Sequence, residues 1–148
     1  MKLSKALKLK NKKLKEYTET FNKAVLYNSY DVDSKQKYNS SELLNTAIAL
    51  RDDYVALKTA IHSTSEPIRS KIFMLGELKT FTKRFENIDT KEGVQKEGYR
   101  EITTRTYVAS ITEEQKNSVL KNVEDQIETL QDEIDTFNAT TELVGYEG

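Results

Sequence analysis

The stretch LKNVEDQIETLQDEIDTF, residues 120–137, decides the fold class. Its large apolar side chains recur at steps of 3, 4, 3, 4 and 3 residues, at Leu120, Val123, Ile127, Leu130, Ile134 and Phe137. A mean step of about 3.5 residues keeps one stripe of a helix facing a partner when the two helices supercoil. Because a single helix cannot bury so narrow a stripe, the sequence predicts helices that pack side by side.

The same heptad repeat occurs in two earlier segments. In the first segment it comprises Leu3, Leu7, Lys10, Leu14, Tyr17, Phe21 and Ala24. In the second it comprises Leu43, Ala47, Leu50, Tyr54, Leu57 and Ile61. We therefore predict a mainly α fold of long antiparallel helices in a coiled-coil-like bundle.

Capping and turn signals divide the chain into four predicted helices. Pro67 suits a first helical turn, because its missing N–H would have no intrahelical partner there. Thr112 and Gln115 match a capping box. We expect helices over about 2–30, from Ser40 or Ser41 to about His62, from Pro67 to Phe85, and over about 112–138. The third would bury Ile68, Ile72, Leu75, Leu78, Phe81 or Thr82, and Phe85.

Residues 99–111 are the exception to the helical pattern. They read YREITTRTYVASI and are rich in β-branched and aromatic side chains, which favour a strand. A strand needs a partner for its N–H and C=O groups. The segment could fold on itself near Thr104, pair with residues 91–98, or pair with its copy in another subunit. We expect a small β-strand or hairpin here, in contact with helices or with a second chain.

The composition favours long solvated helices rather than a thick globular core. Of 148 residues, 36% are apolar and 32% are charged, and the chain has no Cys, no Trp and one His. These counts rule out disulfides, a thiol nucleophile, thiolate metal sites and histidine clusters. We expect residues 1–143 to form a single helical domain and residues 144–148 to be a disordered tail.

Charge is separated along the chain, although the formal net charge is only −1. Residues 1–15 contain seven lysines and no acid, whereas residues 122–142 contain seven acids and no base. The two stretches could face each other within the fold or across subunits, or form independent solvated faces. The lysines could also form a patch for nucleic acid or lipid, but no aromatic side chains are interleaved among them for stacking on bases.

A search for reactive groups assigns no catalytic, cofactor-binding or metal-binding residue. His62 is interpreted as an exposed residue at a helix end. Asp31, Asp33 and Glu42 span a calcium-loop length, but Lys35 occupies a position where such a loop has an oxygen ligand. Acids such as Glu124 and Glu128 form a helix face without the Glu-x-x-His motif of di-metal bundles. We therefore expect a non-enzymatic protein without a cofactor.

No stretch approaches the roughly 18 apolar residues of a membrane span. The basic N-terminus lacks the apolar segment of a secretory signal. We therefore expect a cytoplasmic protein without a transmembrane segment, which the lack of cysteine also fits.

Several stretches resemble the septicolysin-like family of mostly uncharacterised bacterial proteins. They are the opening MKLSKAL, LKTAIHSTS at 57–65, LGEL at 75–78, the strand segment at 100–111, and IDTFNATT at 134–141. The resemblance implies a mostly helical fold and transfers no catalytic residue. Because some members carry a pore-forming cytolysin name, it also implies a membrane-acting toxin as an alternative function.

From these features we expect a self-associating helical structural or protein-interaction module. A homo-oligomer would form through the helix seams and the 99–111 strand. One alternative is a septicolysin-like pore-forming or membrane-acting toxin. Another is a nucleic-acid-associated protein that uses the basic N-terminal helix, although we consider nucleic acid an unlikely partner.

Overall fold

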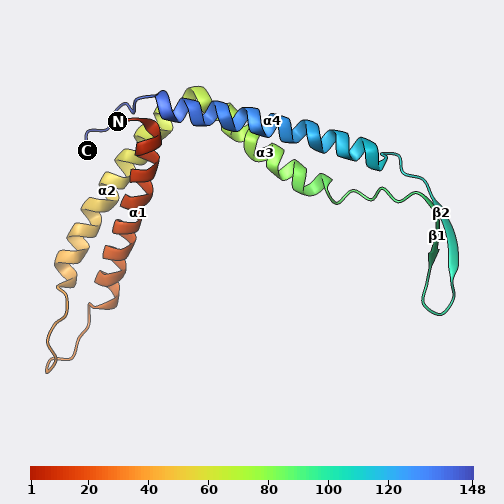
Figure 1. The fold of residues 1–148 in the computed structure, drawn as a ribbon. Helices are drawn as coiled ribbons and strands as arrows, with labels where there is room; N and C mark the ends of the chain where they lie inside the picture. Colours follow the sequence, from red (N-terminus) through yellow and green to blue (C-terminus); the bar gives the residue numbers. More distant parts are fainter. The chain divides into compact units, whose positions relative to one another are not determined.

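The computed structural model describes residues 1–148 and is mainly helical, as the sequence predicts (Figure 1). Its elements are the α-helices α1 (Leu3–Leu26), α2 (Ser40–Thr64), α3 (Arg69–Phe85) and α4 (Glu113–Thr140), the 3₁₀ turn η1 (Glu66–Ile68), and the strands β1 (Gly93–Glu97) and β2 (Thr103–Tyr107). The chain divides into two compact units, one of residues 1–69 with 135–148 and one of residues 70–134.

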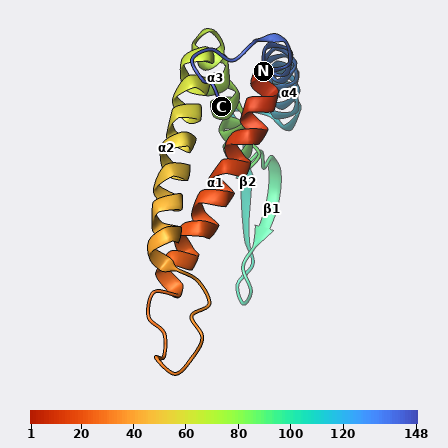
Figure 2. The same ribbon diagram turned by 90° about the vertical axis from the view of Figure 1, so that its left-hand side faces the viewer.

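The first unit is built on a hairpin of two long helices, α1 and α2, which lie side by side in both views (Figures 1 and 2). Its core consists of Leu3 and Ala6 of α1 with Leu57 and Ile61 of α2. The heptad positions predicted for α2, Leu43, Ala47, Leu50, Tyr54, Leu57 and Ile61, are all buried or half-buried. They form the α2 side of the contact between the two helices, which we call the inner seam.

Helix α1 presents to α2 a face that overlaps the predicted one. Five predicted positions are buried or half-buried: Leu3, Leu7, Lys10, Tyr17 and Ala24. The other two, Leu14 and Phe21, are 40% and 41% exposed. The preceding residues Lys13 and Thr20 are half-buried instead, and Ala6 is buried beside Leu7. The small side chain of Ala6 allows α1 to approach α2 closely, and Lys13 reaches Asp53 of α2.

The helix ends mostly follow local sequence signals. At the start of α4, Gln115 N–H donates to Thr112 Oγ1 at 3.2 Å and Thr112 N–H donates to Gln115 Oε1 at 2.9 Å, which confirms the predicted capping box. At the start of α2 the cap is Asn39, whose Oδ1 accepts from Glu42 N–H at 3.2 Å. The predicted caps Ser40 and Ser41 instead lie inside the helix.

The second unit contains α3, the β-hairpin and most of α4. Lys71 Nζ of α3 lies 2.6 Å from Glu133 Oε2 of α4. Along α4 the predicted seam positions 120–134 are buried or half-buried. Along α3 the protected row runs through Leu75, Leu78, Thr82 and Phe85, so Thr82 is the protected one of the two predicted alternatives, Phe81 and Thr82. The predicted Ile72 is exposed.

The strand segment pairs within the chain. Strands β1 and β2 are antiparallel, with Gln95 opposite Arg105, so the alternative pairing with residues 91–98 is the one formed. Only Thr103–Tyr107 of the predicted 99–111 strand is extended and paired. Gly98 has φ of 113°, and a Cβ there would lie 2.1 Å from the Glu101 carbonyl oxygen, so the turn requires glycine.

The two ends of the chain meet in the first unit. Leu3 N–H donates to the Thr141 carbonyl at 2.9 Å, and Leu143 N–H donates to the Met1 carbonyl at 2.8 Å. Glu142 lies 3.0 Å from the N-terminal ammonium and 2.7 Å from Lys2 Nζ, and these two cations hold the pKa of its carboxyl below the ordinary value. The expected disordered tail at 144–148 makes defined contacts, because Tyr146 packs on the core of Leu3 and Leu57.

Truncating the core of the hairpin should destabilise the chain strongly. Leu57 is completely buried, so Leu57→Ala should lower the free energy of unfolding by about 2–5 kcal/mol through lost burial and the cavity left behind. Leu26→Ala removes the same atoms from a mostly exposed position and should cost less than about 1 kcal/mol. Chemical denaturation followed by circular dichroism measures both, and equal losses would contradict this core assignment.

Candidate interaction surfaces

Many large apolar side chains are exposed. Seven apolar residues larger than alanine are buried: Leu3, Leu57, Ile61, Ile68, Leu75, Val123 and Ile134. Another 18 large apolar or aromatic residues are half-buried, and 21 are exposed. Scattered exposed apolar residues are normal, but contiguous groups of them mark interaction sites.

One contiguous group lies along α1. Leu14, Phe21 and Val25 are exposed on one flank of the helix, and Val25 is 65% exposed. Leu7 lies on the same flank but packs against the core. The positions between them on the same flank are Asn11 and Thr18, which carry no charge. The steps from residue 7 to residue 25 are 4, 3, 4, 3 and 4, so α1 carries a second heptad row next to its inner seam.

A matching row lies along α2. Leu44, Ile48 and Val55 are exposed and occupy one flank of that helix. The two rows lie on the same side of the hairpin, because Val25 and Leu44 line one groove of about 550 Å³. We call the six residues Leu14, Phe21, Val25, Leu44, Ile48 and Val55 the outer face.

The opposite side of the hairpin is covered by the C-terminal segment. Tyr146 OH donates to Asp53 Oδ1 at 2.8 Å, and Lys13 Nζ donates to Asp53 Oδ2. The hydrogen bond from Lys13, with that from Tyr146, holds the pKa of Asp53 below its ordinary value. The bond to Asp53 raises the pKa of Lys13, and burial, with the same carboxylate, raises the pKa of Tyr146. Because each polar group has a partner within the cluster, this side is a closed structural contact.

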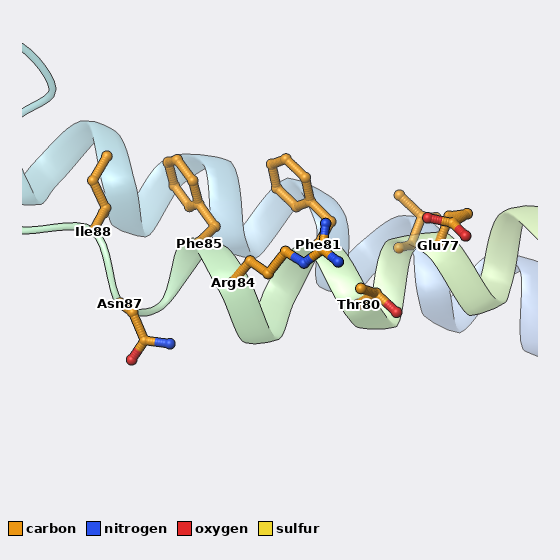
Figure 3. A pocket seen from close by; sticks show the side chains of 8 residues that line it. Glu77, Thr80, Phe81, Arg84, Phe85, Asn87 and Ile88 are labelled. Carbon is orange, nitrogen blue, oxygen red and sulfur yellow. The ribbon is translucent and has the colours of Figure 1, made fainter.

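Another apolar groove, of about 590 Å³, lies at the C-terminal end of α3 (Figure 3). The rings of Phe81 and Phe85 stack at a centroid distance of 5.4 Å and an interplanar angle of 14°. Figure 3 shows both rings and Ile88 pointing the same way, whereas Asn87 points away from them. Arg84 and Glu77 are the charged residues of the lining, and neither has a close ionisable neighbour in the groove that would form a reactive pair.

The two charged stretches are only partly paired with each other. Lys2 bonds Glu142, which joins one end of each stretch. Lys5, Lys8, Lys10 and Lys12 of α1 make no ion pair. On α4, Asp125 pairs with Lys121 at 2.8 Å and Glu133 with Lys71, whereas Glu124, Glu128 and Asp132 make no ion pair.

The residues considered for metal or acid–base chemistry do not converge. His62 is exposed in the last turn of α2. Asp31 Oδ1 accepts from the N–H of Asp33 at 2.9 Å, a local turn within an exposed loop. No group of three or more His, Cys, Asp or Glu side chains could hold a metal ion. None of the helices is both long and apolar enough to cross a membrane.

The clearest surface on the molecule is therefore the outer face of the α1–α2 hairpin. No protein-family model, curated protein or solved structure matches the chain.

The sequence predictions assigned Leu14 and Phe21 to the inner seam and did not single out the Lys13–Asp53–Tyr146 cluster. The available signal was the overlapping second row through Ala6, Lys13 and Thr20, which also has heptad spacing.

The Lys13–Asp53–Tyr146 cluster should make stability depend on pH. Since the pKa of Asp53 is lowered, its stabilising contribution is present above the ordinary carboxyl pKa and is lost as the pH falls through the lowered value. Asp53→Asn should reduce the free energy of unfolding at neutral pH by up to about 1 kcal/mol. The difference from the unmodified chain should vanish in acid, where the carboxyl is protonated in both folded and unfolded states.

The matched control is Asp52→Asn, since Asp52 pairs only with its neighbour Arg51 at the surface. It should change stability little at any pH. Urea denaturation across the acid range measures all three chains. A pH-independent difference for Asp53→Asn would contradict the assigned role of its carboxylate.

Proposed function

We propose that the chain is a non-enzymatic, self-associating helical module whose role is structural or to mediate protein–protein contacts. The observation that carries the proposal is the excess of exposed over buried large apolar side chains, 21 against seven. Association removes such side chains from water, which is worth roughly 25 cal/mol for each Å² of apolar surface buried. We take a second copy of the chain as the partner, since its hairpin carries the same exposed apolar residues.

The arrangement of the exposed residues adds support. On the hairpin they form the two rows of the outer face, and the α1 row has the heptad spacing of a helix–helix contact. The uncharged Asn11 and Thr18 between the α1 residues reduce the desolvation cost of covering that row. The same rows would be unfavourable on a permanently monomeric protein, because they expose apolar surface to water.

The site chemistry fits a binding role better than a catalytic one. Lys13, Asp53 and Tyr146 satisfy one another, so none is available to a substrate. We further propose a cytoplasmic location, with which the cysteine-free sequence is consistent. Membership of the septicolysin-like family remains a proposal that rests on the sequence stretches quoted above.

A second candidate function is nucleic-acid binding through α1. One observation favours it: Lys5, Lys8, Lys10 and Lys12 are left without acidic partners on one helix. Lysines that contact phosphates release counterions, so binding would weaken steeply with salt.

Titration of duplex DNA at several salt concentrations tests this second function. If Lys12 contacts phosphate, Lys12→Gln should reduce the slope of log affinity against log salt by about 1. Lys79→Gln on α3, which also removes an unpaired lysine, should leave the slope unchanged. Absence of binding at low salt would eliminate the candidate.

Self-association predicts a mass above that of one chain. Sedimentation equilibrium at micromolar concentration should give a multiple of 17.0 kDa. The melting temperature should rise with protein concentration, because association stabilises the folded state by mass action. A mass of one chain and a melting temperature independent of concentration would contradict the proposed function.

A further inference from the structure

We infer that two copies of the chain pack their outer faces together into a four-helix bundle in which α1 of one copy lies against α2 of the other. The inference rests on the proposed self-association and adds the surface, the partner and the pairing of the helices. The binding partner of the outer face is a second copy of the chain.

The side of the hairpin that carries the outer face is large enough for a dimer interface, and the six outer-face residues occupy about half of its length, residues 14–25 of α1 and 44–55 of α2. At 1.5 Å per residue, the 24 residues of α1 extend about 36 Å, and two neighbouring helices are about 20 Å wide. One side of the hairpin is therefore about 700 Å² in projection, close to the roughly 800 Å² that each partner contributes to a standard protein interface. A helical hairpin of the same length is the shape that covers this face from end to end.

The repeat pattern indicates a helical occupant. Helix α1 carries two neighbouring heptad rows, and the inner one is already used against α2. The outer one, through Leu14, Phe21 and Val25, has the spacing that keeps it aligned with another long helix. A helix with two such rows fits a bundle in which it has two helical neighbours.

Charge selects between the two symmetric ways of pairing identical hairpins. Helix α1 carries seven lysines and two glutamates, so α1 against α1 would bring two strongly basic helices together. Helix α2 carries Glu42, Asp52 and Asp53 against Arg51 and Lys58. Because Asp53 bonds Lys13 on the opposite side of the hairpin and Asp52 pairs with Arg51, the acids of α2 add little attraction for the partner's lysines. Placing α1 on the partner's α2 is favoured because it avoids the repulsion between two strongly basic helices.

This pairing also brings the apolar rows level with each other. A two-fold axis parallel to the helices keeps every residue at its height along the bundle. Within one chain Lys13 lies at the same height along the hairpin as Asp53, because the two side chains are in contact. Val25 lies at the height of Leu44, because both line one groove. Leu14 therefore comes within about one helical turn of the partner's Val55. In the same way Phe21 falls between the partner's Leu44 and the partner's Ile48.

Disulfide trapping tests the pairing directly, because the chain has no cysteine of its own. Leu14→Cys and Val55→Cys are prepared as separate full-length proteins, mixed in equal amounts and oxidised mildly. The mixture should give a covalent species of twice the 17.0 kDa chain mass, whose peptide map links the two introduced cysteines. Each protein alone should remain at the single-chain mass in a denaturing gel without reductant.

The matched control replaces Leu14→Cys with Lys12→Cys, which lies on α1 away from the outer face. Mixed with Val55→Cys, it should give no covalent dimer above background. Efficient linking of Leu14→Cys to itself would overturn the inference in favour of α1 packing on α1. Sedimentation as a dimer without any linkage through residues 14 and 55 would also overturn it but leave the proposed function standing, whereas a monomeric mass would remove both.

Discussion

The packing of Leu3 and Ala6 of α1 onto Leu57 and Ile61 of α2 is the contact on which the first unit depends. Each helix alone has too narrow an apolar stripe to be stable, so the two helices must cover each other. Phe137, Leu143 and Tyr146 pack against the same four residues. The end of α4 and the C-terminal segment are thus held by the cluster that joins the hairpin, which explains why both ends of the chain lie beside it.

A polar contact supports the orientation of α1 that this core packing sets. Lys13 lies at the inner seam and reaches Asp53, which in turn accepts a hydrogen bond from Tyr146. A polar residue within a helix seam commonly fixes register at some cost in stability. Rotating α1 by one position to bury Leu14 would take Lys13 away from this partner. The polar contact therefore favours the orientation that leaves Leu14 and Phe21 exposed.

The sequence predicted some of these features well and others poorly. Four helices, the Thr112 capping box and the seam positions of α2 and α4 followed from periodicity and local capping chemistry, because neighbouring residues determine them. On α1 the exposure of Leu14 and Phe21 did not follow, since two overlapping heptad rows share this helix and only the position of α2 distinguishes them. The pairing of Tyr146 with Asp53 spans 93 residues and has no local signal. The cap of α2 is Asn39, one residue before the expected Ser40 or Ser41. All three residues can cap a helix, so the sequence alone did not distinguish them.

The sequence by itself determined that long helices form, where most of them begin and end, and that each needs a neighbour. Helix periodicity and capping act over a few residues, so they can be read without knowing the rest of the chain. Only the tertiary structure decided which stripe of α1 faces inward, which strand partner is used, and how the C-terminal segment closes one side of the hairpin. Those choices depend on contacts between residues far apart in the chain, whose relative free energies are set by packing and charge together.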